Sequence, residues 1–266
     1  MPFADVNGHR LYYEVHGSDG RTVILSHGFA LDHDMWEFVV PVLAADHRVV
    51  FWDERGHGMT DCRGPFDYWD SASDCLGVMD AAGAATAVLV GMSQGGFLNL
   101  RAALQAPDRV EGLVLVNSAV QAFIPEVREG LAQMAAAWTT LGPVGEIADA
   151  MLGLQFGAGG YDGATWAARW RARPPADWTH PWGALLDRAS DPDEVLTDRL
   201  AKLEIPVAII HGGQDAGFPL SMAQEMNELL RDGRGLTVIP DASHCPPLTH
   251  PEPVTDALVA FLRSLS

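Results

Sequence analysis

Cysteine is scarce in this chain, and the motifs that usually bind structural or catalytic zinc are missing. The 266 residues include three cysteines, with no Cys-x-x-Cys and no His-Glu-x-x-His. This argues against a structural zinc site and against a zincin-type metalloprotease. An odd number of cysteines also favours free thiols in a reducing compartment, so we expect a cytoplasmic protein. We expect no bound metal and no other cofactor. The cysteines are Cys62, Cys75 and Cys245.

Positive charge is scarce as well. Lys202 is the only lysine, and the formal net charge is −18. A protein that binds nucleic acid or an anionic membrane through a basic face would carry the opposite balance. We therefore expect neither nucleic acid nor membrane as a partner and interpret the acidic surface as a source of solubility. The sequence leaves homo-oligomer formation open.

Targeting and membrane-spanning patterns are also missing. Residues 1–5 lack the basic start followed by an apolar run that is typical of a signal peptide, so none is expected. One uncharged span, 81–100, has the length of a membrane helix. Glycines and polar residues interrupt this span. We interpret it as a strand, a turn and a helix of a water-soluble fold.

Ser93 lies at the centre of that span, within Gly91-Met92-Ser93-Gln94-Gly95-Gly96. An apolar strand pattern, 87–90, precedes it, and a helical pattern, 97–105, follows it. A serine at the apex of such a turn is typical of a nucleophile elbow, and the glycines give a strained turn the space it needs. A glycine-rich turn can also carry a serine by chance. The prediction therefore depends on a base, an acid and an oxyanion hole elsewhere in the chain.

The rest of the chain mostly alternates apolar strand patterns with helical patterns, which predicts an α/β fold with a mostly parallel, doubly wound sheet. Asn7-Gly8 is typical of a two-residue hairpin turn. Strands are expected at 3–6, 9–16, 22–26, 47–52, 87–90, 110–117, 205–211 and 236–239. Helices are expected at 36–45, 73–83, 97–105, 221–230 and 254–262.

The alternation stops between residues 120 and 197. Apolar residues recur there at helical spacing, and the segment holds five of the eight tryptophans. We therefore predict a helical cap at 120–197, inserted into an α/β core formed by 1–119 and 198–266.

A serine nucleophile needs an adjacent base, and histidine suits this role because its pKa of about 6.5 allows reversible proton transfer. In doubly wound sheets, functional side chains lie at the carboxyl ends of strands. We favour His244, in the loop after the last strand. His27 is interpreted as support for its own loop, and His57 as structural. His211 ends a strand whose following loop offers a better acid than base.

The acid of such a site orients the histidine and stabilises its cation. Asp215 follows the strand expected at 205–211 and is favoured, although a turn aspartate or helix cap is the plainer interpretation. The order Ser93, Asp215, His244 is that of α/β-hydrolases. Other candidate acids are Asp53, Asp241 and Glu126.

With these pieces the sequence resembles a small serine esterase or lactonase of the α/β-hydrolase fold superfamily, including the 3-oxoadipate enol-lactonases, over essentially its whole length. The resemblance implies an oxyanion hole formed by the backbone N–H groups of Phe29 and Gln94, and a cap over the pocket. Gln94 also suits this role because the first amides of a helix are unpaired. The matching segments are His27-Gly28-Phe29, Asp53-x-Arg55-Gly56-x-Gly58, Gly91-x-Ser93-x-Gly95-Gly96, Gly212-x-x-Asp215 and His244.

The residues at two positions narrow the reaction by the same resemblance. Haloalkane dehalogenases and epoxide hydrolases of this superfamily use aspartate where this chain has Ser93. Carbon–carbon bond hydrolases commonly have tryptophan after the catalytic histidine, and here that residue is Cys245. We therefore expect hydrolysis of a small-molecule carboxylic ester or lactone through an acyl-enzyme intermediate.

The substrate itself is less constrained. The cap tryptophans could line an apolar pocket or simply form its core. An arginine cluster in the cap could attract a carboxylate-bearing lactone or form a solvated helix face. A cofactor-free perhydrolase or haloperoxidase, a cofactor-free oxygenase and a non-catalytic ligand-binding protein remain alternatives. The candidate pocket residues are His27, Trp138, Trp166, Trp170 and Trp182, and the arginines are Arg169, Arg171 and Arg173.

Overall fold

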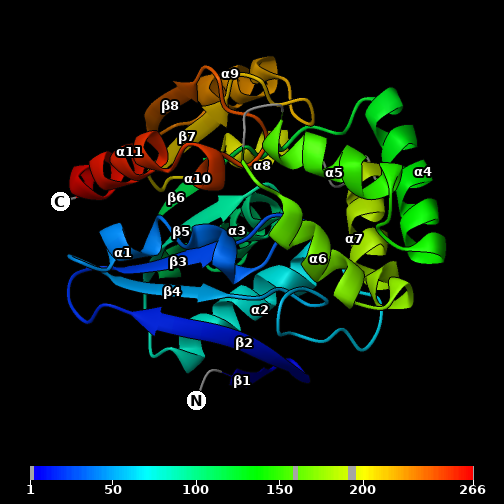
Figure 1. Cartoon of the computed structure of the whole chain (residues 1–266). Coiled ribbons are helices and arrows are strands. Elements are labelled where there is room, and N and C mark those ends of the chain that lie inside the picture. The colour runs from blue at the N-terminus through cyan, green and yellow to red at the C-terminus, as the bar shows by residue number, and fades with distance from the viewer. Residues whose placement is uncertain (1–2, 158–160, 191–195, 266) are drawn as a thin grey trace.

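An eight-stranded sheet forms the centre of the protein, seen here in a computed structural model that describes residues 3–157, 161–190 and 196–265. The strand order is β1-β2-β4-β3-β5-β6-β7-β8 (Figure 1). The pairs β1–β2 and β2–β4 are antiparallel, and all other neighbours are parallel. The predicted α/β fold with a mostly parallel sheet is therefore confirmed. The strands are β1 (Phe3–Val6), β2 (His9–His16), β3 (Thr22–Ser26), β4 (Arg48–Trp52), β5 (Ala87–Met92), β6 (Val110–Val116), β7 (Val207–Gly212) and β8 (Gly233–Ile239).

Strand positions follow the hydrophobic pattern closely. The first three strands have the predicted bounds, and the ends of the others differ from prediction by three residues or fewer. Asn7 and Gly8 both have positive φ, 48° and 79°, as the predicted hairpin turn requires. The residues of β5 and β7 are all buried, which explains their continuous apolar runs.

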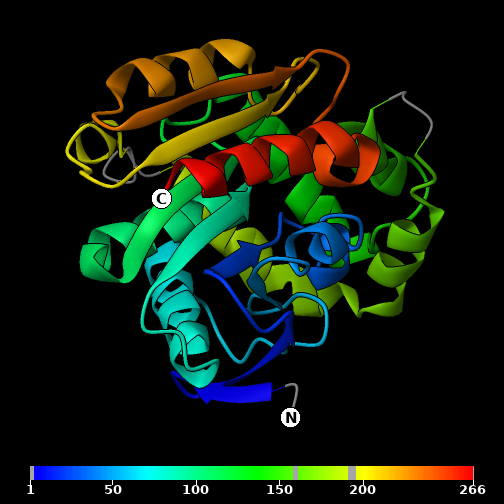
Figure 2. The ribbon, with the colours of Figure 1, turned by 90° about the vertical axis from the view of Figure 1, so that its left-hand side faces the viewer.

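Helices cover both faces of the sheet. Figures 1 and 2 show α2 and α3 on one face and α1 and α11 on the other, and the helices of each pair contact one another. No helix in the described ranges is long and apolar enough to cross a membrane. The helices that come before β6 or after β7 in the chain are α1 (Val40–Leu43), α2 (Tyr68–Ala81), α3 (Gln94–Gln105), α9 (Leu220–Leu229), α10 (Pro246–Thr249) and α11 (Pro251–Ser264).

Two helix predictions need correction. The helix expected at 36–45 is instead a 3₁₀ turn, His33–Trp36, followed by the four-residue α1. Pro41 accounts for this, because proline lacks the N–H that an interior helical residue donates and fits only the first turn of a helix, so the helix begins at Val40 and cannot run through Pro41 from Trp36. The helix expected at 73–83 begins earlier, at Tyr68. Asp67 caps it by accepting hydrogen bonds from the first-turn amides, and Asp70 completes a capping box.

Among the described residues between β6 and β7, where the sequence predicts a helical insertion, there are five helices. Figure 1 shows α4–α7 on the side toward which the parallel strands point. We refer to 120–197 as the helical insertion; its exact boundaries, and those of the core segments 1–119 and 198–266, stay a prediction. The helices are α4 (Pro125–Leu141), α5 (Glu146–Phe156), α6 (Ala164–Ala172), α7 (Thr179–Ser190) and α8 (Thr197–Leu200), and a 3₁₀ turn, η3 (Pro175–Trp178), precedes α7.

Candidate active site

Ser93 occupies a sharp turn between β5 and α3, with φ of 52° and ψ of −115°. Positive φ is strained for a residue with a side chain, and close packing around the turn maintains it. A β-carbon on Gly91 would lie 2.2 Å from the carbonyl oxygen of Gly95, and one on Gly95 would lie 2.2 Å from that of Ser26. The predicted strand, sharp turn and helix around Ser93 are therefore confirmed, and the glycines are needed because backbone passes so close to them.

The structure brings together the serine, histidine and aspartate that the sequence selects. Ser93 Oγ lies 3.0 Å from His244 Nε2, and His244 Nδ1 lies 2.8 Å from Asp215 Oδ2. All three residues are buried. Because Nδ1 faces a carboxylate, it carries the imidazole proton and donates a hydrogen bond to Asp215. Nε2 is then free to accept a hydrogen bond from the Ser93 hydroxyl.

Asp215 accepts hydrogen bonds on both carboxylate oxygens. Oδ1 receives the amides of Gly217 and Phe218, at 2.8 and 3.1 Å. Oδ2 receives Asn117 Nδ2 at 2.6 Å in addition to His244. Burial opposes ionisation of this carboxyl, but the charge of His244 and these hydrogen bonds outweigh it and lower the pKa of Asp215. The site therefore holds an ionised carboxylate against the imidazole.

Asn117 is a site residue that sequence reasoning missed. Its Nδ2 also donates to the carbonyl of Ser243 at 3.2 Å, and its Oδ1 accepts the amide of Gly212 at 3.0 Å. Asn117 follows β6 with φ of 42°, a conformation that asparagine tolerates better than most residues. Its side chain thus ties the ends of β6 and β7 to the loop that carries His244. An asparagine at a strand's carboxyl end is the signal that could have identified it.

Of the two predicted oxyanion donors, Gln94 follows Ser93 directly in the chain, and Phe29 lines the same cavity. Gln94 is the first residue of α3, so its amide has no acceptor within the helix. Phe29 lines the same cavity as Ser93 and His244. The backbone before Phe29 is held by His27, whose Nδ1 donates to the carbonyl of Gly28 at 2.8 Å.

The other candidate histidines, His27, His57 and His211, are hydrogen-bonded to backbone groups. His27 Nε2 accepts the amide of Glu54 at 3.0 Å, so both of its ring nitrogens are occupied. His57 Nδ1 lies 3.0 Å from the carbonyl of Arg55, and His211 Nε2 lies 2.9 Å from that of Phe218. Burial lowers the pKa of all three imidazoles. These contacts fit structural roles. Asp53 accepts the backbone N–H groups of His33 and Met59.

A cavity of about 210 Å³ opens beside Ser93. Its walls come from the helical insertion and from the loops after β3 and β7, and they are mostly apolar. Three of the lining residues have polar side chains: Ser93 and His244, which the sequence analysis identified, and Gln155, which it did not. The lining residues are Phe29, Ser93, Phe123, Val127, Gly130, Leu131, Met151, Leu154, Gln155, Leu185, Ala216, Gly217, Phe218 and His244.

None of the residues predicted to line the substrate pocket, which are His27, Trp138, Trp166, Trp170 and Trp182, is among the residues that line this cavity. The Trp138 ring packs against those of Trp170 and Trp182, with centroids 5.4 and 5.7 Å apart, and Trp182 also packs on the cavity residue Phe29. The four tryptophans are at most 3% exposed. Trp138 and Trp182 lie in the apolar core of the insertion, the plainer of the two interpretations, whereas Trp166 and Trp170 line the larger cavity described below. Spacing alone cannot distinguish a ring that lines a pocket from one that lies behind its wall.

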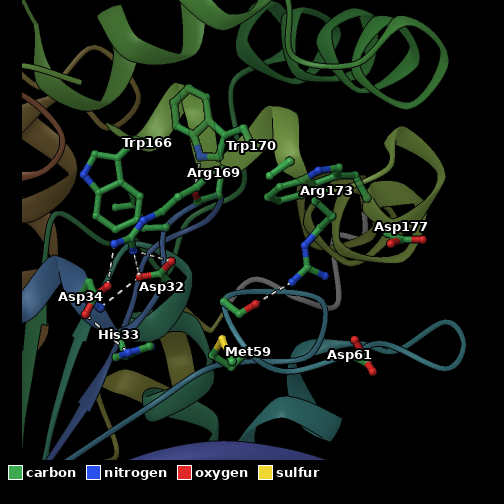
Figure 3. A pocket seen from close by; sticks show the side chains of 15 residues that line it. Asp32, His33, Asp34, Met59, Asp61, Trp166, Arg169, Trp170, Arg173 and Asp177 are labelled. Atoms are coloured by element: carbon green, nitrogen blue, oxygen red, sulfur yellow. Dashed lines mark hydrogen bonds and ion pairs between the residues drawn. The ribbon is translucent and has the colours of Figure 1, made fainter. Parts of the chain in front are cut away.

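A larger cavity, of about 510 Å³, lies outside the Ser93 cavity, between the insertion and two loops of the core. Figure 3 shows Arg169 reaching from α6 to both Asp32 and Asp34. Arg173 donates to the carbonyl of Gly58 at 2.9 Å. The two arginines are therefore engaged at this junction, and neither lines the Ser93 cavity. Exposed Arg171 does not line it either.

One group of potential metal ligands lies at the edge of the larger cavity. Asp32, His33 and Asp53 bring ligand atoms within 4.8 Å of one another. Protein donors already serve these carboxylates. Arg169 bonds Asp32, and the backbone amide and ring of His33 bond Asp53. The arrangement is that of an ion-pair network and does not call for a cation.

Comparison with known proteins identifies relatives along the whole chain. The model of a family described as alpha/beta hydrolase fold matches residues 21–251. A pimeloyl-[acyl-carrier protein] methyl ester esterase of Pectobacterium carotovorum is 26% identical over 264 residues, which span 96% of this chain and 99% of the esterase. A proposed carbamate hydrolase, RutD, of Azorhizobium caulinodans is 37% identical over 118 residues, so the matched region spans only 44% of that protein. The crystal structure of the enol-lactonase from Burkholderia xenovorans LB400 superposes with a TM-score of 0.87 at 26% identity, covering 98% of this chain and 100% of the lactonase.

Proposed function

This chain belongs to the alpha/beta hydrolase fold family, and we propose that within the family it is a serine hydrolase of small, uncharged carboxylic esters or lactones. One observation carries the proposal: Ser93, His244 and Asp215 form a continuous chain of hydrogen bonds at the wall of a mostly apolar cavity. Esterase and lactonase relatives support the choice of reaction. The three cysteines are free thiols, which supports the cytoplasm as the compartment.

In the first half of the reaction, Ser93 Oγ attacks the carbonyl carbon of the substrate. His244 Nε2 takes the hydroxyl proton as the new bond forms, because a neutral serine is a poor nucleophile. Asp215 keeps the imidazole in the required tautomer and stabilises the imidazolium that results. The lowered pKa of Asp215 fits this role, because the carboxylate must stay ionised throughout.

The tetrahedral intermediate places negative charge on the former carbonyl oxygen. The backbone N–H groups of Phe29 and Gln94 are the proposed donors to this oxyanion. Loss of one such donor typically slows an enzyme by about 10²–10³-fold. The intermediate collapses when His244 returns the proton to the leaving alkoxide, which leaves an acyl group on Ser93. A water molecule then repeats the sequence and releases the acid.

The cavity limits the substrate. Its volume of about 210 Å³ is below the range of roughly 300–1,000 Å³ typical of sites for drug-sized ligands, so the group it holds is small. Apart from His244, none of its lining residues carries an ionisable side chain. A buried carboxylate without a partner is costly. We therefore propose an uncharged ester or lactone in preference to a carboxylate-bearing lactone.

Release of p-nitrophenol from p-nitrophenyl butyrate tests the proposal directly. The purified protein should hydrolyse this ester, and Ser93→Ala should lose about 10³-fold or more in kcat/KM. A fluorophosphonate probe should label the wild type at Ser93 and leave Ser93→Ala unlabelled. Activity that survives in Ser93→Ala would remove Ser93 from the mechanism. A wild-type protein that is inert toward esters and lactones of varied size would overturn hydrolysis itself.

A further inference from the structure

The loop that carries Phe29 is bonded to the helical insertion at several successive residues. We call residues 28–34 the oxyanion loop. Gln155 Nε2 donates to the carbonyl oxygen of Phe29 at 2.9 Å, and Trp170 Nε1 donates to that of Ala30. Arg169 bonds both carboxylate oxygens of Asp32, as Figure 3 shows. Each acceptor belongs to the core, and each donor belongs to the insertion.

This loop needs external support. Ala30 has φ of 58°, in the left-handed region that a residue with a β-carbon rarely occupies. Such a conformation persists only where the surroundings hold it. The hydrogen bonds to Phe29 and Ala30 flank the strained residue, because they fix the carbonyls on both sides of its backbone. The insertion therefore maintains the shape of the loop.

Gln155 is the donor closest to the proposed chemistry. It lines the Ser93 cavity and is 2% exposed. Its backbone carbonyl also accepts the amide of Cys245, the residue after His244, at 2.8 Å. The end of α5 thus contacts the oxyanion loop through a side chain and the histidine loop through the backbone.

The hydrogen bond from Gln155 acts on the peptide unit that follows Phe29. The preceding peptide unit, whose N–H is the proposed oxyanion donor, is held through the carbonyl of Gly28, which accepts from His27 and from the amide of Leu31. Both units share the Phe29 α-carbon, so a rearrangement of the loop that moves this atom changes the direction of both units. Without Gln155 the buried Phe29 carbonyl would lack this partner, and the loop would rearrange to satisfy it.

We propose that Gln155 is a positioning residue, which holds the Phe29 N–H in line with the developing oxyanion and makes the helical insertion part of the catalytic machinery. This inference rests on the proposed function for the role of Phe29. The contact itself, a glutamine of the insertion holding the oxyanion loop, can be tested without any substrate.

The kinetic test compares Gln155→Leu and Gln155→Glu with the wild type. Leucine keeps the apolar bulk, whereas glutamate keeps the length and shape but lacks the N–H donor. Both variants should lose about 10-fold or more in kcat with KM within about threefold, because a misplaced donor weakens transition-state binding selectively. The affinity for an alkylboronic acid, whose tetrahedral adduct with serine presents an oxygen to the oxyanion hole, should fall by the same factor as kcat/KM.

Gln121→Leu is the matched control. Gln121 lies in the same insertion and its Nε2 donates to the carbonyl of Met222 at 3.1 Å, but it does not line the Ser93 cavity. This variant removes side-chain hydrogen bonds to Met222 and Glu225 of α9, which are not part of the oxyanion loop. It should keep the wild-type kcat and the wild-type affinity for the boronic acid.

Hydrogen–deuterium exchange of peptides covering 28–34 tests the contact independently of chemistry. Exchange there should accelerate in both Gln155 variants and stay unchanged in Gln121→Leu. A folded Gln155→Leu protein with wild-type exchange in this segment, or with kcat and boronic acid affinity within twofold of wild type, overturns the inference. If the wild type hydrolyses no ester or lactone, the proposed function fails, and the exchange data still decide whether Gln155 holds the loop.

Discussion

The side chain of Asn117 donates to the same oxygen of Asp215 that accepts the imidazole N–H of His244. The Asn117 Nδ2 to Asp215 Oδ2 distance is 2.6 Å, and the His244 Nδ1 to Asp215 Oδ2 distance is 2.8 Å. Asn117 follows β6 and Asp215 follows β7, so neighbouring parallel strands deliver the donor and the acid to one point. The geometry makes Asn117 part of the electrostatic environment of the triad.

Replacing Asn117 with aspartate should shift the pH dependence of hydrolysis. A second carboxylate beside Asp215 favours the protonated forms of both Asp215 and His244, because like charges repel and an anion stabilises the imidazolium. The acidic limb of the kcat/KM profile should therefore move to higher pH. Asn117→Gly is the control: it tolerates the φ of 42° and adds no charge, so its activity should fall without a shifted limb. Superimposable wild-type and Asn117→Asp profiles would contradict this prediction.

Asp215 should contribute to the acid sensitivity of the fold. Its native pKa is lowered, whereas an aspartate in an unfolded chain has a pKa of about 3.9. Ionised Asp215 therefore stabilises the native state above about pH 3.9, and this contribution is lost as the pH falls through the lower native pKa. Urea unfolding at stepped pH should show the stability difference between wild type and Asp215→Asn narrowing below that point. Two parallel curves down to pH 2 would be inconsistent with a lowered native pKa.

Gly95→Ala should destabilise the protein strongly. The added methyl would lie 2.2 Å from the carbonyl oxygen of Ser26, and its three nearest neighbours are all backbone atoms of Ser26 and His27, which leaves little room to relax. Overpacking of this kind typically costs about 1–3 kcal/mol, and we expect the upper end or more. Gly153→Ala is the matched control, because no atom lies within 4 Å of its added methyl. Alanine favours helix over glycine by about 1 kcal/mol, so this α5 variant should melt at or above the wild-type temperature. Equal melting temperatures for the two variants would argue against the close packing at Gly95.

Leu131 should set the length of the acyl group that the enzyme accepts. It lines the Ser93 cavity from α4. Leu131→Ala should raise the ratio of kcat/KM for p-nitrophenyl octanoate to that for the butyrate by about 10-fold or more, since each methylene that fits an apolar pocket contributes at least this much. Leu141→Ala, on the same helix at a residue that is 66% exposed, should leave the ratio unchanged. An unchanged ratio in Leu131→Ala would mean that the acyl group binds elsewhere.

Much of the fold follows from the sequence because burial leaves a direct pattern in it. Strands such as β3 and β5 are buried on both faces and so read as continuous apolar runs. The helix expected at 36–45 does not form as predicted. The prediction relied on the apolar pattern there and did not take Pro41 into account. The family and the hydrolase class of enzyme are confirmed by the comparisons.

The candidate site was predictable where position in the fold suffices. Ser93, Asp215 and His244 each follow a strand of the parallel sheet, and parallel strands bring their carboxyl ends to one edge. Gln155 had no such marker, because its partner Phe29 is 126 residues away and the contact depends on how α5 packs. The tryptophans were misplaced for a related reason. Their spacing indicates a helix face, but the face toward the cavity belongs to residues such as Leu131 and Met151.

The hydrogen bond between Ser93 and His244 joins residues 151 positions apart. A growing or refolding chain cannot form it until nearly the whole sheet is assembled and the final loop has closed over the serine. Contacts of such long range form late, because loop-closure entropy must be overcome first. Ester hydrolysis would therefore be a reporter of completed folding, silent in every truncated or partly folded intermediate. A screen for activity in a mutant library would, for the same reason, select for foldability along with catalysis.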